Sequence, residues 1–476
     1  MLRRIALLSI LALALAGPAT AAKLTVRNID AAGIGFNDPT PVAPVGGNEG
    51  TTLGQQRLNV FLAAAETWSK ALESDVEIVI EATFSPITST PCTETTGVLG
   101  HAGPQEFAVN FANAPKINVY YPVALANKLA RRDLSPDKAD IFVRFNSDVD
   151  LASCLGEAGW YYGLDRKAGE DWDLFVVVLH ELGHGLGLSG PASVPQFTNN
   201  RPSIFETFIY DTTTKARWDQ MTLAQREASL LNTGNIVWDG PRANTAARQW
   251  LLPTTMLNVS APASIAGGYD IGTATFGPAV DRSSMNGAIV AALDEANGTT
   301  PSTLDACTTL TNEFQVAGKI ALADRGECAF TIKARNAQTA GAIGIVIVDN
   351  RKEDCLPPGM APSGDSSDIV IPVVSVRQED GNLIRAQLAS GVTAQLRTNA
   401  SQLAGTAREG SVRLYTPCTV KPGSSLFHFD ITASPNVLME PDVNTDLLHG
   451  LDLTPALLMD LGWSEPARSG RRLTKR

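Results

Sequence analysis

The chain contains 476 residues, of which 44% are hydrophobic and 18% are charged, and its formal net charge is −11 at pH 7. A chain of this length exceeds one typical domain, so we expect two or three folded units with a sizeable core. The acidic balance argues against nucleic acid as a partner, because binding to phosphates needs an excess of positive charge.

Residues 1–21 have the layout of a secretory signal peptide. Arg3 and Arg4 give a positive start, residues 5–16 form an apolar run, and residues 19–21 are small, as at a cleavage site. The apolar run is too short to cross a bilayer as a helix, and no later run reaches that length. We therefore expect an exported mature protein, extracellular or periplasmic, without an integral membrane segment.

The six cysteines are an even number, which in an exported chain favours disulfides over free thiols. Sequence order alone does not choose among the possible pairings. We predict that neighbours along the chain pair, which gives Cys92 with Cys154, Cys307 with Cys328, and Cys355 with Cys418.

The first part of the mature chain, residues 22–257, carries alternating helical and strand patterns before and around one apolar helix. Helices are predicted over residues 53–71, 120–129, 174–186 and 222–232, and β segments over residues 76–84, 139–145 and 160–162. This order of helix, strand, strand and a further helix is typical of an α/β domain.

The predicted helix 174–186 carries the pattern H-E-x-x-H. His180 and His184 lie four residues apart, so on a helix both imidazoles project from one face toward a single metal ion. Glu181 lies where it can reach a water bound to that metal. Gly187 continues a longer pattern whose last histidine would complete the zinc site, but this chain has Gly190 at that position.

The third ligand must therefore come from elsewhere, and three other histidines remain: His101, His428 and His449. His428 is preferred, because a Leu-Met-Glu-Pro turn containing Met439 follows it. Metzincin peptidases place such a methionine beneath the zinc, shortly after the third ligand. His101 and His449 are expected at the surface. Glu206 is kept as an alternative carboxylate ligand of the gluzincin kind, although residues 204–208 lack that family's pattern.

Over residues 173–190 and 421–463 the chain resembles the leishmanolysin family of metzincins. In that family an insertion separates the third histidine from the helix, and it lies in a Ser-His-Trp-like context before the methionine turn. Here Phe427 stands where the family often has serine. The resemblance implies a Zn²⁺ ion bound by His180, His184 and His428, with Glu181 as the catalytic base and Met439 in the turn.

The composition changes near residue 258, and residues 258–398 are rich in Gly, Ala and Val with few charges. Their β-α-β order indicates a compact independent module. The stretch resembles the protease-associated (PA) domain, most recognisably over residues 321–350. Such domains are not catalytic, and the resemblance implies contacts with substrates or partners.

The expected fold is therefore an α/β (α+β) metzincin-like zinc peptidase domain in two sequence halves, interrupted by a β-rich PA domain. The halves are residues 22–257 and 399–467, and residues 468–476 form a basic, disordered tail. The long separation between His184 and His428 is acceptable, because the entropy of loop closure rises only logarithmically with length.

The predicted function is that of a secreted zinc endopeptidase acting on proteins or peptides, in which Glu181 activates a water. Tyr161, Tyr162, Asp430 and Glu440 are candidates to stabilise the oxyanion or to orient the ligands. The alternative is an exported binding or adhesion protein that uses the PA domain and retains an inactive zinc site. A purely structural zinc site fits poorly, because Glu181 would then have no role.

Overall fold

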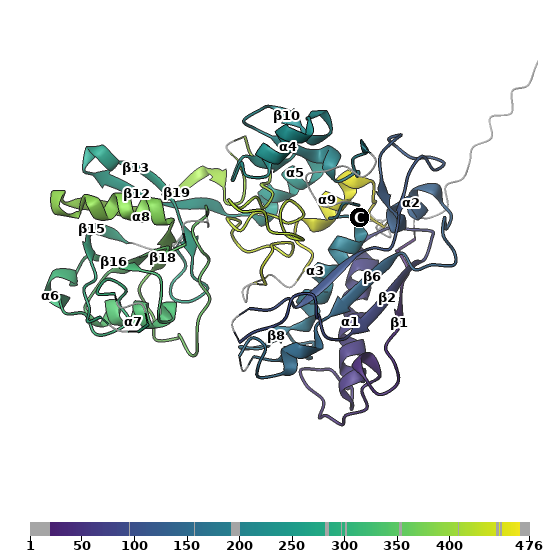
Figure 1. The fold of residues 1–476 in the computed structure, drawn as a ribbon, viewed down its shortest axis with the longest axis horizontal. Coiled ribbons are helices and arrows are strands. Elements are labelled where there is room, and N and C mark those ends of the chain that lie inside the picture. The colour runs from purple at the N-terminus through teal and green to yellow at the C-terminus, as the bar shows by residue number, and fades with distance from the viewer. Residues whose placement is uncertain are drawn as a thin grey trace, which may run out of the picture.

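The computed structural model describes residues 20–466, except residues 95, 157, 192–199, 281–284, 297, 300–301, 352–354, 408, 444–446 and 448–449. Residues 1–19 of the predicted signal peptide, the basic tail and His449 lie outside the described residues. The described elements form two bodies, which lie side by side in Figure 1. We name residues 253–403 the inserted module and the remaining described residues the main body.

The main body contains a four-stranded sheet in the order β1-β2-β6-β3. The strands β1 (Leu24–Asn28), β2 (Ile78–Phe84) and β6 (Ile141–Phe145) run parallel. At the edge, β3 (Gly100–Pro104) pairs antiparallel with β6. Side chains alternate between buried and half-buried along β6, because successive residues point to opposite faces.

Two helices pack over this sheet, and their bounds agree with the sequence prediction. The first is α1 (Leu53–Ala71), whose N-cap Thr52 accepts a hydrogen bond from the Gln55 amide. The second is α3 (Leu174–Leu186), all of whose residues are buried between α1, the sheet and the C-terminal part of the chain. The apolar composition of α3 follows from this burial on every side.

Smaller elements complete the main body. They are the helices α2 (Val123–Ala130), α4 (Leu223–Ser229), α5 (Pro241–Trp250) and α9 (Thr454–Leu461), the sheet of β9 (Ile209–Asp211), β10 (Ala216–Arg217) and β11 (Ile236–Trp238), and the strand pairs β4 (Phe107–Ala108) with β5 (Tyr121–Pro122) and β7 (Trp160–Tyr161) with β8 (Trp172–Asp173). Helix α5 was not predicted, and α2 begins later than predicted. The remaining predicted elements lie close to their expected positions.

The chain returns to the main body after the inserted module. The Leu414 amide donates to the Ile236 carbonyl at 2.9 Å, and the Trp238 amide donates to the Val412 carbonyl at 2.8 Å. Helix α9 packs against α5. Residues on either side of the module therefore share one core.

The inserted module is built on an eight-stranded sheet in the order β13-β12-β19-β15-β16-β17-β18-β14. Its strands are β12 (Pro253–Ala261), β13 (Gly267–Asp270), β14 (Gly272–Thr273), β15 (Asn286–Ala291), β16 (Ile320–Asp324), β17 (Gly344–Val348), β18 (Val373–Val376) and β19 (Val392–Leu403). Its helices are α6 (Glu313–Val316), α7 (Phe330–Thr339) and α8 (Gln378–Ala386). Separate hydrophobic clusters give the module its own core.

The two ends of the inserted module lie next to each other. Strands β12 and β19 pair antiparallel, and Pro253 lies opposite Leu403. The module sheet therefore extends beyond the predicted limits of 258 and 398. Because the ends of the insertion are already paired, the module separates the two halves of the main body in sequence without separating them in space (Figure 1).

The disulfide prediction is confirmed, and none of the six cysteines is free. Cys92–Cys154 lies within the main body, and Cys307–Cys328 lies within the module. The third disulfide, Cys355–Cys418, joins the module to the main body. The two bodies are thus connected by this disulfide as well as by the two chain segments that enter and leave the module.

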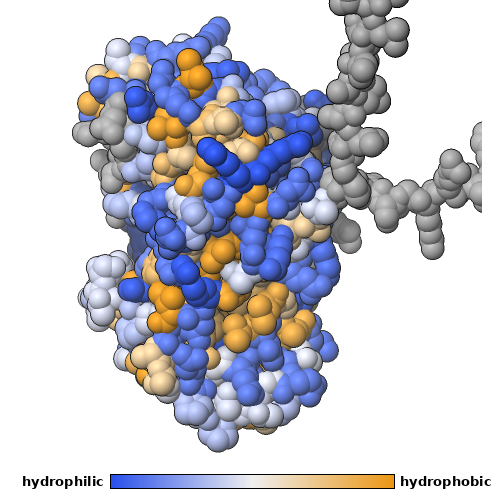
Figure 2. Space-filling view, turned by 90° about the vertical axis from the view of Figure 1, so that its right-hand side faces the viewer, coloured by the Kyte–Doolittle hydropathy of each residue, from blue (hydrophilic) through white to orange (hydrophobic). Residues whose placement is uncertain are grey.

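The face of the main body that lies away from the module carries mixed side chains. Figure 2 shows hydrophobic atoms in small groups separated by hydrophilic ones. In the described part of the chain, no helix has the length and apolar character needed to cross a membrane.

Candidate metal centre

Helix α3 places two imidazoles on one face. Asp173 caps the helix by accepting a hydrogen bond from the Phe175 amide at 3.0 Å, which fixes where the helix begins. His180 and His184 follow one turn apart on the buried side. Gly187 ends the helix, and its amide donates to the Gly183 and His184 carbonyls.

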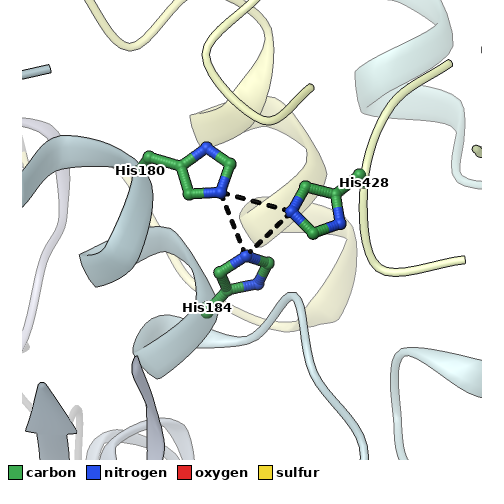
Figure 3. A group of neighbouring side chains, drawn as sticks. All are labelled: His180, His184 and His428. Atoms are coloured by element: carbon green, nitrogen blue, oxygen red, sulfur yellow. Dashed lines mark hydrogen bonds between the residues drawn. The ribbon is translucent and has the colours of Figure 1, made fainter. Parts of the chain in front are cut away.

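His428 reaches the same point from the segment that follows the inserted module. The Tyr415 amide donates to the His428 carbonyl at 2.9 Å, and the Phe429 amide donates to the Met439 carbonyl at 2.7 Å. These bonds hold His428 opposite α3, as Figure 3 shows. The sequence prediction that His428 lies with His180 and His184 agrees with this placement.

The three imidazoles point their Nε2 atoms at a common centre. Each pair of Nε2 atoms among His180, His184 and His428 is 3.2 Å apart (Figure 3). Zinc–nitrogen bonds of about 2.0–2.1 Å at tetrahedral angles would separate ligand nitrogens by roughly 3.3 Å. The spacing therefore matches three ligands of one zinc ion.

The protonation of the rings excludes hydrogen bonds among these Nε2 atoms. The Nδ1–H groups of His180, His184 and His428 donate to the carbonyls of Leu438 (2.7 Å), Leu188 (2.8 Å) and Ser424 (2.7 Å), respectively. A carbonyl only accepts, so each Nδ1 carries the proton of the neutral ring. Each Nε2 is then a bare lone pair, and three lone pairs facing one another need a cation between them.

Burial keeps the three rings neutral. Desolvation, with a smaller electrostatic contribution from His184, lowers the pKa of His180 to about 3. Desolvation also lowers the pKa of His184, and it holds the pKa of His428 well below its usual range. Neutral imidazole is the form that binds metal ions, so these residues fit zinc.

Glu181 lies beside the histidines, between α3 and the edge strand β3. Its carboxylate accepts a hydrogen bond from the Ala102 amide, and burial raises its pKa to about 8. A Cβ atom on Gly100 would lie 3.2 Å from the Glu181 Cγ, so the glycine leaves room for this side chain. A cation at the three imidazoles would favour the ionised carboxylate.

The turn that contains Met439 packs against α3 at Gly183. Met439 is fully buried, and its Sδ would lie 2.6 Å from a Cβ atom on Gly183. The preceding Leu438 supplies the carbonyl that fixes His180. Sequence reasoning missed Asp452, whose carboxylate accepts the Leu438 amide at 2.5 Å and the Thr454 amide at 3.0 Å. The only signal for it was an Asp-x-Thr pattern before helix α9.

The remaining candidates lie apart from this cluster. A Cβ atom on Gly190 would lie 3.0 Å from Phe427 Cζ, so an aromatic ring fills the place expected for a histidine. Glu206 is buried and accepts the Ser203 amide at 2.5 Å, and burial raises its pKa to about 7. It does not join the histidine cluster. His101 is exposed as predicted, and it lies on strand β3.

The four residues proposed for the oxyanion or for ligand orientation are hydrogen-bonded to near neighbours. Tyr162 donates to Asp150 at 2.6 Å, and Tyr161 donates to Asp165. Asp430 accepts the Thr432 amide at 3.0 Å, and Glu440 accepts the Val437 amide at 3.0 Å. These bonds place none of the four in the histidine cluster.

Comparison with family models assigns two segments of the chain. Residues 285–384 match the PA domain, which confirms the predicted module. Residues 47–235 match the SPBPB7E8-like family, a stretch that includes the H-E-x-x-H helix. Each match covers less than half of the chain, and neither description names leishmanolysin or the metzincins.

Curated relatives share limited segments. Vacuolar-sorting receptor 2 of Arabidopsis thaliana is 31% identical over 170 residues, which are 33% of this chain and 26% of the receptor. Uncharacterized protein PB7E8.01 of Schizosaccharomyces pombe is 30% identical over 150 residues, 30% of this chain and 25% of that protein. Aminopeptidase YwaD of Bacillus subtilis is 38% identical over 82 residues, 17% of each. The chain thus spans about a quarter or less of these relatives.

Solved structures give weaker matches. A zinc aminopeptidase from Bacillus subtilis is 21% identical, over 33% of this chain and 36% of that one, with a TM-score of 0.21. An aminopeptidase from Aneurinibacillus sp. strain AM-1 is 19% identical, over 34% and 38%, with a TM-score of 0.22.

Proposed function

We propose that the chain is an exported zinc-dependent endopeptidase of the metzincin type, with a catalytic unit made of residues 22–257 and 399–467. The observation that carries the proposal is the convergence of three bare Nε2 lone pairs at 3.2 Å from one another. The resemblance to leishmanolysin supports it through the same residues. The predicted signal peptide and three disulfides support an extracellular or periplasmic location.

In the proposed mechanism His180, His184 and His428 hold Zn²⁺, which when bound supplies a polarised water and a Lewis acid for the peptide carbonyl. Glu181 accepts the proton of the attacking water and then gives it to the leaving amine. The Ala102 amide keeps the Glu181 carboxylate in place during both transfers. Burial of Glu181 suits it to hold a proton briefly near neutral pH.

The position of the edge strand β3 favours a polypeptide as the substrate. It pairs with β6 on one side and is the outermost strand of its sheet. The unpaired side of an edge strand can add an extended peptide through backbone hydrogen bonds. Because Ala102 of this strand also contacts Glu181, a peptide added here would pass the catalytic base, as hydrolysis within a chain requires.

The PA domain match favours a second candidate function, in which the chain binds proteins and its zinc site is inactive. The two candidates differ in what Glu181 does. In an inactive site, the buried Glu181 beside the three histidines would have no role to offset the cost of its burial.

Casein hydrolysis by the purified full chain distinguishes the two candidates. We expect hydrolysis that a chelator abolishes and that added Zn²⁺ restores. Glu181→Gln should keep its zinc and lose hydrolysis, because the amide cannot accept the proton. No hydrolysis by a zinc-loaded wild-type chain would favour the binding protein, whereas wild-type hydrolysis by Glu181→Gln would contradict the assignment of Glu181 as the base.

A further inference from the structure

A large cleft lies between the inserted module and the main body, outside the candidate metal centre. Its volume is about 1060 Å³. The module contributes strands β13 and β14 and the residues after β16 and β18, including Arg325 and Arg377. The main body contributes Arg413, residues 431–436 and Glu440. The site is therefore formed only when both bodies are in place.

The wall on the main-body side belongs to the segment that carries the third histidine. Residues 431–436 follow His428 closely, and Glu440 follows Met439 directly. Met439 is fully buried and packs against Gly183 of α3, so this wall belongs to the segment that contacts the metal-binding helix. A molecule in the cleft would contact the same segment that completes the metal site.

The module is held to this wall at two separate points. The paired strands β12 and β19 form one attachment, and the Cys355–Cys418 disulfide forms the other. Pro357 and Gly359, shortly after Cys355, line the cleft. The disulfide therefore fixes the position of one cleft wall relative to the segment that leads to His428.

The lining of the cleft has the chemistry of a polypeptide site. It contains positive groups (Arg325, Arg377, Arg413), negative groups (Asp270, Asp380, Glu440) and apolar surface (Phe330, Met360, Ile431). Arg377 pairs with Asp380 within the cleft, and Arg325 pairs with Asp349. Both signs of charge in one cleft suit a chain with varied side chains better than a ligand of one charge. Strand β13, at the edge of the module sheet, adds backbone groups for an extended segment.

We propose that this cleft binds a part of the polypeptide substrate that is remote from the bond being cut. The inference rests on the proposed endopeptidase function. The Cys355–Cys418 disulfide holds the cleft at the width that this segment needs. Long substrates thus gain binding that short peptides cannot reach.

The variant Gly359→Trp tests the proposal by filling the cleft. A Cβ atom on Gly359 meets no other atom within 4 Å, so the indole enters open space rather than the core. Gly359→Ala is the size control at the same position. Gly267→Trp is the matched control, because a Cβ atom there also meets open space and Gly267 does not line the cleft.

We expect Gly359→Trp to raise the KM for casein by about tenfold, equivalent to losing ~1.4 kcal/mol of binding. Hydrolysis of a short quenched peptide and the zinc content should stay at wild-type values. Both control variants should match the wild type. Equal effects on casein and the short peptide, no effect on either, or the same loss in Gly267→Trp would overturn the proposal.

A binding assay in the Glu181→Gln background separates this proposal from the proposed function. Fluorescently labelled casein should bind that chain, and Gly359→Trp should weaken the binding about tenfold even if no variant hydrolyses casein. The double variant Cys355→Ser/Cys418→Ser should also weaken it, with zinc still bound. Unchanged casein binding in Gly359→Trp would show that the cleft is not a polypeptide site.

Discussion

Met439 packs against Gly183, in the turn of α3 between His180 and His184. The Met439 Sδ would lie 2.6 Å from a Cβ atom at position 183, so any larger residue would displace the helix or the sulfur. The glycine that weakens the helix by about 1 kcal/mol relative to alanine is thus required for contact with the methionine turn.

We predict that Gly183→Ala lowers zinc affinity, although alanine favours a helix. The added methyl group would overpack the contact with Met439, at a cost of roughly 1–3 kcal/mol. The helix and the turn would move apart, and with them His180 and its partner Leu438. Zinc affinity measured by chelator competition should fall. A variant with wild-type zinc affinity would show that this contact does not position the ligands.

The sequence predicted those features that local patterns determine. Helices α1 and α3 have clear apolar spacing and caps at Thr52 and Asp173, and their bounds were predicted correctly. His428 was proposed as a ligand because few histidines remained and Met439 followed it, and the structure places it beside His180 and His184. The pairing of cysteines that are neighbours in sequence was also correct.

Features that depend on distant partners were missed. Residues 100–104 lack the β-branched side chains of a strand, and they form β3 only because β6 lies alongside. The long β12–β19 pair joins segments on opposite sides of the module sequence, which no local pattern links. Asp452 acts through the Leu438 backbone, and the Asp-x-Thr pattern before α9 does not indicate this long-range contact.

Asp452 should tune zinc affinity through this backbone link. Its carboxylate accepts the Leu438 amide, and the Leu438 carbonyl accepts the His180 ring proton. Asp452→Asn replaces one acceptor oxygen by an NH2 group that cannot accept, so we expect a zinc affinity lower by roughly tenfold. The measurement is chelator competition, with thermal unfolding of the zinc-loaded protein as the control. A lower melting temperature without a change in affinity would limit Asp452 to capping α9.

Glu206 tests the alternative ligand set. It is buried and bound to the Ser203 amide, and it is not part of the histidine cluster. Glu206→Gln should therefore keep the wild-type zinc content. Because burial raises the pKa of Glu206 to about 7, the amide should be tolerated without a large loss of stability. Loss of zinc from this variant would support the gluzincin arrangement instead.

Asp140 should make the free energy of unfolding depend on pH. It is buried and accepts hydrogen bonds from the Val79 amide and the Asn127 side chain, each at 2.8 Å. Desolvation raises its pKa from 3.8 to about 6, so between these values the folded chain binds a proton that the unfolded chain has released. The free energy of unfolding should therefore fall as pH rises from about 4 to 6, by up to ~3 kcal/mol from this group.

Urea unfolding of the wild type and Asp140→Asn at both ends of this pH range measures that contribution. The amide does not titrate, so the variant should lose less stability than the wild type as pH rises. Zinc release at low pH affects both proteins equally and cancels in the comparison. Identical pH profiles would show that Asp140 does not titrate in this range.

Zinc content is the most direct measurement of the central claim, that His428 completes a site begun by His180 and His184. Metal analysis of the purified full chain should find one zinc ion per chain, and His428→Ala should lose it. The matched control His101→Ala, which removes an exposed histidine from β3, should keep its zinc. A His428→Ala chain that retains the full zinc content of the wild type would contradict the account.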